Sequence, residues 1–175
     1  MFRKASQVVV VIGLFAAAGV ALAAQDRTAL KVPDGLSFAE FKGYEDWAPV
    51  APSQVKDGLK VIAANAVMIK AYKRGLPAPD KRFPEGSKIV KLEWAPTPNP
   101  RSPYAVTVPG TLMSVSFIEK DSKRFPKTKG WAYAQFTYDA ASGALKPSVK
   151  GTDCGHACHS GVAAQDYIFT AYPKR

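Results

Sequence analysis

Cysteine and histidine are scarce in this chain of 175 residues, which has two of each. The chain also lacks an internal repeat, a low-complexity block and any run of five basic residues. Its 14 prolines and 13 glycines, with 47% hydrophobic and 22% charged residues, exclude a collagen-like chain, a coiled coil and a wholly disordered chain. The formal net charge is +10, but its basic residues are scattered among acidic ones. This favours a solvated basic surface over a nucleic-acid site and leaves a redox partner protein as an alternative.

The one long hydrophobic run lies near the N-terminus, from Val8 to Ala24, and Arg3 and Lys4 precede it. A basic start, a short apolar stretch and a closing A-x-A pattern predict a secretory signal peptide over residues 1–23, with an uncleaved N-terminal anchor as the alternative. Its removal leaves residues 24–175, which are enough for one domain with a core. We therefore expect a periplasmic protein without stable membrane insertion.

The spacing of apolar residues and the turn signals predict a single α+β domain. The expected strands are Leu59–Ala64, Lys88–Trp94, Thr111–Ile118, Trp131–Tyr138 and a closing strand Asp166–Tyr172. Short helices are expected over Leu36–Trp47 and Ala66–Arg74, and Asp139–Gly143 reads as a turn. Four prolines between residues 96 and 103 predict a long irregular loop. Five strands in this order predict a mainly antiparallel sheet with short helices.

Both cysteines and both histidines lie in one six-residue stretch that runs from Cys154 to His159. Two cysteines followed at once by histidine are typical of c-type haem attachment, in which the thiols add to the haem vinyl groups and the histidine binds the iron. The usual spacer has two residues, and this one has three. The Cys158-His159 pair is the ordinary one, and we expect Gly155 to let a longer loop bulge. His156 is then expected to be a solvent-exposed loop residue.

Three alternatives to haem remain open for this stretch. A zinc site would need four ligands from six consecutive residues, which can hardly surround one ion tetrahedrally. A disulfide between Cys154 and Cys158 is the stronger alternative, because exported proteins often close a loop in this way. It would make the chain a periplasmic binding module without haem. A redox-active thiol pair is the third alternative.

Longer segments of the chain resemble the cytochrome P-460 family, whose relatives include the cytochromes c′-beta. The resemblance runs from Tyr44 to Arg175 and is carried by Tyr44–Trp47, Phe83–Leu92, Lys120–Phe125, Trp131–Phe136, Cys158-His159 and Asp166–Thr170. It implies a periplasmic, mostly β haem c protein, commonly a homodimer. The haem would be held by Cys154 and Cys158, with His159 as the proximal iron ligand.

The resemblance also singles out Lys91, which matches the lysine that is bonded to the haem ring in P-460 members. The strand pattern alone makes Lys91 a solvent-facing lysine on one face with Ile89 and Glu93, and Lys88 lies on the other face. The c′-beta relatives lack the bond and bind gases. The resemblance therefore implies oxidation or detoxification of hydroxylamine or nitric oxide, with a gas-binding or electron-transfer cytochrome without turnover as the alternative.

The other side of the iron is expected to be open. The chain has no third histidine, and the methionines left after signal removal, Met68 and Met113, lie in apolar stretches where a core role is expected. An open iron binds small ligands such as nitric oxide, hydroxylamine or peroxide. The resemblance further implies a distal carboxylate, for which Glu93, Asp121 and Asp139 are candidates with exposed-surface alternatives.

Overall fold

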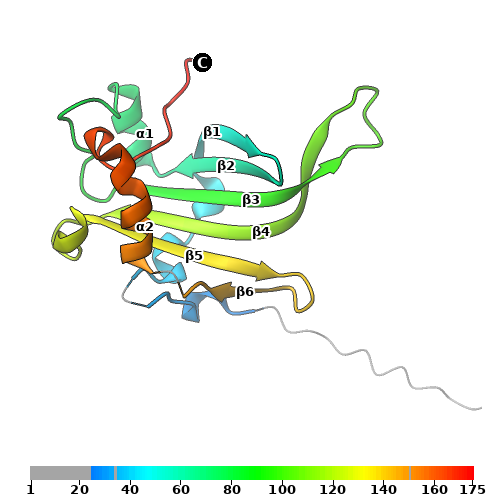
Figure 1. Cartoon of the computed structure of the whole chain (residues 1–175), viewed down its shortest axis with the longest axis horizontal. Helices are drawn as coiled ribbons and strands as arrows, with labels where there is room; N and C mark the ends of the chain where they lie inside the picture. The colour runs from blue at the N-terminus through cyan, green and yellow to red at the C-terminus, as the bar shows by residue number, and fades with distance from the viewer. Residues whose placement is uncertain (1–24, 34, 150) are drawn as a thin grey trace, which may run out of the picture.

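The structure is a computed structural model that describes residues 25–33, 35–149 and 151–175. The predicted signal peptide over residues 1–23 lies outside the described residues. One antiparallel sheet has six strands in the order β1-β2-β3-β4-β5-β6, so every strand pairs with its neighbour in sequence (Figure 1). The strands are β1 (Ala48–Val55), β2 (Gly58–Ala64), β3 (Lys88–Pro98), β4 (Thr107–Lys120), β5 (Trp131–Asp139) and β6 (Ala144–Pro147). The mainly antiparallel α+β fold of a single domain is confirmed.

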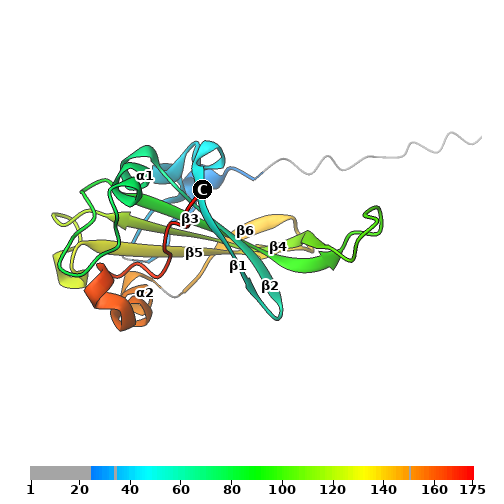
Figure 2. The same cartoon turned by 90° about the horizontal axis from the view of Figure 1, so that it is seen from above.

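Strands β2 to β5 and the turn after β5 were predicted, whereas β1 and β6 were not. Strand β1 carries Pro49 and Pro52 and lies at the edge of the sheet, where proline costs no ladder hydrogen bond on its open side. The prediction of an irregular loop is wrong for Pro96 and Pro98, because Pro96 pairs with Pro109 and Pro98 with Thr107 in an extension of β3 and β4, and it is confirmed for residues 99–106. This arm has only two strands, so its outer sides tolerate proline (Figures 1 and 2).

The helices are short, and two of the expectations need correction. Helix α1 (Ala66–Lys73) is confirmed, with Asn65 as its N-cap. The expected helix Leu36–Trp47 is instead two 3₁₀ turns, η2 (Phe38–Phe41) and η3 (Tyr44–Asp46), because Gly43 between them has a φ of 81°. The remaining short turns are η1 (Arg27–Ala29), η4 (Pro126–Thr128) and η5 (Ser160–Gln165). No helix among the described residues is long and apolar enough to cross a membrane.

The C-terminal part differs most from expectation. The Cys/His stretch is not a loop but helix α2 (Thr152–His159). The expected closing strand Asp166–Tyr172 is absent, because Asp166 and Tyr167 have φ values of 50° and 65°. Two consecutive residues in the left-handed region turn the chain sharply and cannot continue a strand.

The sheet carries a separate hydrophobic core on each face, because successive strand residues point to opposite sides. The N-terminal segment with η1 to η3 covers one face, and α2 with the C-terminal segment covers the other (Figure 2). Val90 and Phe117 belong to the first core, whereas Ile89 and Tyr133 belong to the second. The functional site described next lies on the second face.

Candidate functional site

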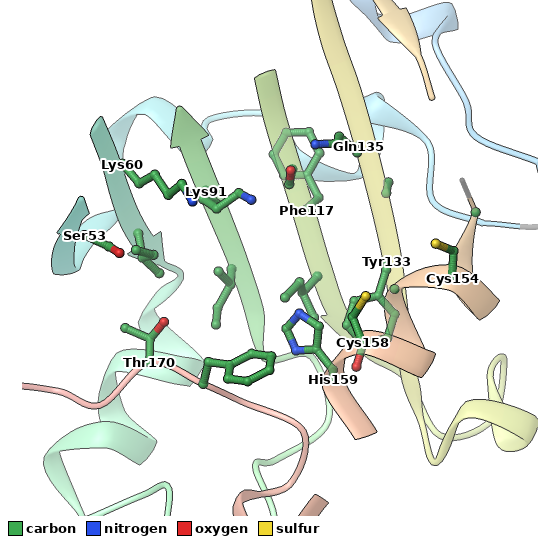
Figure 3. A pocket seen from close by; sticks show the side chains of 18 residues that line it. Ser53, Lys60, Lys91, Phe117, Tyr133, Gln135, Cys154, Cys158, His159 and Thr170 are labelled. Carbon is green, nitrogen blue, oxygen red and sulfur yellow. The ribbon is translucent and has the colours of Figure 1, made fainter. Parts of the chain in front are cut away.

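A cavity of about 530 Å³ lies between the sheet and α2 (Figure 3). This volume is within the ordinary range for a cofactor or small-molecule site. Side chains from five strands, one helix and the C-terminal segment line it: Ser53 of β1, Lys60 and Ile62 of β2, Ile89 and Lys91 of β3, Ser116 and Ile118 of β4, Tyr133 and Gln135 of β5, Cys154, Cys158 and His159 of α2, and Phe169 and Thr170 of the C-terminal segment. Residues more than a hundred positions apart in the sequence therefore meet here.

Strand register arranges the sheet side of the cavity in two rows. Lys91 pairs with Ile62 on one side and with Ser116 on the other, and Ser116 pairs with Gln135. The next row is less polar, since Ile118 pairs with Ile89 and with Tyr133. The rings of Tyr133 and His159 are 4.7 Å apart, so the histidine stands at the less polar row.

Helix α2 lies unusually close to β5. The hydroxyl of Thr152 accepts from the backbone N–H of Tyr133 at 3.4 Å and lies 3.3 Å from the carbonyl of the same residue, which fixes the start of the helix. A Cβ on Gly155 would come within 2.4 Å of the Tyr133 side chain, so only glycine permits this approach. The expected role of Gly155 in a loop bulge is wrong: it allows a helix to pack against a strand.

The helical conformation explains the three-residue spacer between the two cysteines. Cys154 and Cys158 are four residues apart, so they lie on the same helix face about one turn from each other. Both thiols are exposed and unpaired, and both border the cavity beside His159 (Figure 3). The longer spacer therefore keeps both thiols directed to one side without a bulge.

One hydrogen bond determines the chemical form of His159. Its Nδ1 lies 2.6 Å from the carbonyl oxygen of Tyr167. A carbonyl only accepts, so Nδ1 carries the hydrogen and donates it, which leaves the Nε2 lone pair free for a metal. Burial lowers the pKa of His159 and the nearby charge of Lys91 adds to this effect, whereas the hydrogen bond to Tyr167 opposes it. The net downward shift of the pKa favours the neutral imidazole, which is the form that binds metal ions.

Lys91 and Lys60 share one carboxylate at the polar row. The Nζ of Lys91 is 3.5 Å from Oε2 of Glu93, and the Nζ of Lys60 is 3.4 Å from Oε1 of the same side chain. Lys88 lies on the opposite face, 3.2 Å from Glu119, as the strand pattern predicted. Lys91 thus borders the cavity, although the strand pattern alone would have placed it in solvent.

Comparison with known families agrees with this site. The family model described as Cytochrome P460 matches residues 41–170, well over half of the chain. This chain belongs to the cytochrome P460 family. The family binds haem, which fits c-type attachment in this cavity. No curated protein matches the chain.

The residues of this cytochrome P460 chain fit a covalently held haem on three structural grounds. Two free thiols share one helix face, His159 presents an unprotonated Nε2, and apolar side chains border the space beside it. A zinc site has less support, since the described residues contain no group of three or more His, Cys, Asp or Glu side chains placed to hold a metal ion.

His156 is not the solvent-exposed loop residue that was expected. It lies in α2 and is half-buried, with its ring 4.9 Å from Tyr167 and 6.5 Å from Tyr133. Its Nδ1 is buried and has no hydrogen-bond partner within the described ranges. His159, not His156, borders the cavity.

The candidate carboxylates and the two methionines differ in whether they contact the cavity. Asp121 accepts from the N–H groups of residues 123 and 124, and Asp139 accepts from those of the turn after β5. Glu93 is thus the one of the three candidate carboxylates that pairs with cavity residues. Met68 is in the core as expected, whereas Met113 is exposed, and the described cavity lining includes neither.

No sequence pattern singled out Lys60, Ser53 or Gln135, which border the cavity. Each is a single polar residue in a strand, and only the pairing register shows that it shares a face with Lys91. Asp166, a buried carboxylate, was not predicted as a site residue either. Its one signal was membership of the Asp166–Thr170 segment of the family resemblance.

Proposed function

We propose that this chain carries a haem c attached through Cys154 and Cys158, with His159 as the axial iron ligand, and that it oxidises or detoxifies hydroxylamine or nitric oxide in the periplasm. The observation that carries the proposal is the hydrogen bond from Nδ1 of His159 to the Tyr167 carbonyl, next to Cys158 at the cavity. It supplies one oriented nitrogen donor beside one attachment thiol.

Haem bound here supplies an iron that binds small nitrogen ligands and passes electrons. The chain contributes binding, orientation and proton handling. His159 binds the iron through Nε2, and Ile89 and Ile118 keep its surroundings partly apolar. Glu93, held between Lys60 and Lys91, is the group that can take up and release protons near the polar row.

Lys91 is the residue proposed to bond to the haem ring. Its amine borders the cavity, which supports the bond. An N–C bond to the ring would replace a ring C–H bond and release two protons and two electrons, so it would require an external two-electron oxidant such as peroxide. Oε2 of Glu93, 3.5 Å from Nζ of Lys91, is positioned to accept a proton that the amine releases. The same ion pair also suits the alternative of a gas-binding or electron-transfer cytochrome, in which Lys91 stays unbonded to the haem.

Haem attachment is tested on protein matured with the haem-attachment machinery. After extraction with acidified acetone, haem should remain on the polypeptide. Intact-mass measurement should then show the added mass of the haem. Cys158→Ala should lower the yield of holoprotein more than Cys154→Ala, because Cys158 adjoins the iron ligand. Loss of all haem on extraction, or a mass that fits only a Cys154–Cys158 disulfide with no Soret band, would support the binding module without haem instead.

The lysine bond and turnover are tested by Lys91→Ala, with Lys60→Ala as the matched control. Both variants remove an ammonium group that pairs with Glu93 in the same cavity. A bonded Lys91 gives a haem peptide that joins its segment to Cys158 and a red-shifted Soret band, which Lys91→Ala alone removes. If the wild-type protein shows an ordinary haem c spectrum and does not consume hydroxylamine with a chemical oxidant, the gas-binding function replaces the enzyme.

A further inference from the structure

A buried carboxylate lies directly before the residue whose carbonyl holds His159. Asp166 is only 1% exposed. Its Oδ2 accepts from the backbone N–H of Phe83 at 2.8 Å, and its Oδ1 lies 3.2 Å from Nζ of Lys120. Such burial is costly for a charge unless it is paired and hydrogen-bonded, so this arrangement holds Asp166 strongly in one place.

Asp166 occupies the first position of the left-handed turn described above. Its N–H donates to the carbonyl of Ala163 at 3.0 Å, and the N–H of Tyr167 donates to that of Val162 at 3.1 Å. These two bonds close the turn on the side of η5. The left-handed region is unfavourable for a bulky residue such as Tyr167, so a further contact must keep the turn in this form. The buried Asp166 side chain, bonded to the Phe83 N–H and to Lys120, is one contact of this turn with the rest of the fold.

The partners of Asp166 belong to the sheet and its connections. Lys120 ends β4 and pairs with Trp131, and its Nζ also donates to the carbonyl of Lys129 at 3.1 Å. Helix α2 is fixed to the same sheet through Gly155 and Tyr133. The donor ring of His159 and the acceptor carbonyl of Tyr167 are therefore both positioned relative to β4 and β5.

We propose that Asp166 is a positioning residue for the axial ligand: it holds the Tyr167 carbonyl on Nδ1 of His159 and so sets how strongly Nε2 donates to iron. This inference rests on the proposed function, in which His159 binds haem iron. Donation from Nδ1 raises the basicity of the coordinating nitrogen, and loss of such a partner typically weakens metal binding by on the order of 10-fold or more. A stronger donor stabilises ferric iron and lowers the reduction potential.

The experiment compares double variants of equal charge. Removing Asp166 alone would leave Lys120 buried and unpaired, so Lys120→Met is included in every variant. Asp166→Asn keeps an oxygen for the Phe83 N–H and tolerates the left-handed turn. Asp166→Ala keeps neither property. Asp166→Gly adopts the turn freely but lacks the oxygen, and it replaces the Ala variant if the latter does not fold.

The readouts are the iron–histidine stretching frequency by resonance Raman spectroscopy and the reduction potential of the holoprotein. We expect the Asn variant to match the wild type, whose net charge is the same, and the Ala and Gly variants to show a lower stretching frequency and a higher potential than the Asn variant. Equal values in all the variants would overturn the inference while leaving haem ligation by His159 intact. A wild-type protein without a histidine-ligated haem would overturn the proposed function, and this inference with it.

Discussion

At the scale of single residues, two histidines on the same short helix have different roles because of what surrounds them. His159 donates to a backbone carbonyl and borders the cavity, whereas His156 packs between tyrosine rings. Their positions in the chain differ by only three residues. The difference in environment therefore determines which of the two histidine rings is available to bind iron.

We predict that His159→Ala leaves haem attached but changes the iron spectrum, because the axial nitrogen is lost while both thiols remain. His156→Ala is the matched control from the same helix and should leave the spectrum close to that of the wild type. Optical and magnetic-resonance spectra of the two holoproteins measure this. A larger change in the His156 variant would mean that the ligand is His156.

At the scale of secondary-structure elements, the packing of α2 on β5 is the contact that brings the thiols and His159 to the sheet. Gly155 makes the close approach possible, since no space for a side chain exists between its Cα and Tyr133. Helix α2 itself has only eight residues, and an isolated helix of this length is not stable in water. Its position therefore depends on tertiary contacts.

Gly155→Ala should accordingly displace α2 and destabilise the protein by about 1–3 kcal/mol, the usual cost of overpacking. Gly161→Ala is the control, because a Cβ at Gly161 would meet nothing within 4 Å and the residue is not in the left-handed region. Urea denaturation measures the free energy of unfolding, and haem yield reports on the site. Equal stability of the two variants would contradict the close helix–strand contact.

The Asp139–Lys146 pair in the β5–β6 hairpin should make the stability of the protein depend on pH in acid. A hydrogen bond from Lys146, assisted by the N–H groups of Ser142 and Ala141, lowers the pKa of Asp139 to about 2. A depressed carboxyl pKa adds stability above the unfolded value, near 3.8, and this contribution is lost as pH falls through about 2. Carboxyl NMR titration should show this low pKa, and Lys146→Met should raise it. An unchanged pKa in that variant would show that the ion pair is not its main cause.

At the scale of the whole molecule, the sheet separates two hydrophobic cores, which differ in how much they contribute to the cavity proposed to hold haem. The core beneath the N-terminal segment includes Phe38, Phe117 and Phe136 in edge-on ring contacts, and of these three only Phe117 also borders the cavity. The core on the α2 face includes Ile62, Ile89 and Tyr133, which also border the cavity. Haem should therefore stabilise the two faces unequally.

We predict that protein produced without the haem-attachment machinery keeps its sheet and its N-terminal layer but loses protection in α2 and in residues 166–172. The reason is that both segments contribute residues to the cavity lining, among them Cys158 and His159 of α2 and Phe169 and Thr170 of the C-terminal segment. Hydrogen exchange of the apo and holo forms measures the difference for each segment. The N-terminal layer is the internal control, and an equal loss of protection in both layers would contradict the separation of the cores.

Local sequence was sufficient to predict the attachment chemistry that we propose and much of the fold. The Cys158-His159 pair identifies the thiol and the nitrogen donor because they are neighbours in the chain, and apolar spacing located β2 to β5 and α1. Lys91 was found only through the family resemblance, since a lysine in a strand has no local mark that distinguishes solvent from a cavity. The prolines of the arm misled the prediction because their tolerance depends on which strand edges are free.

Only the tertiary structure showed that Lys60 and Lys91 share Glu93, that Gly155 lets a helix approach Tyr133, and that buried Asp166 bonds to Phe83 and Lys120. These relations join residues that are distant in sequence. Strand register, helix approach and a left-handed turn are each chosen by the packing and hydrogen bonds of the folded chain. Local composition does not specify those partners, so the orientation of the axial histidine could not be derived from the Cys/His stretch.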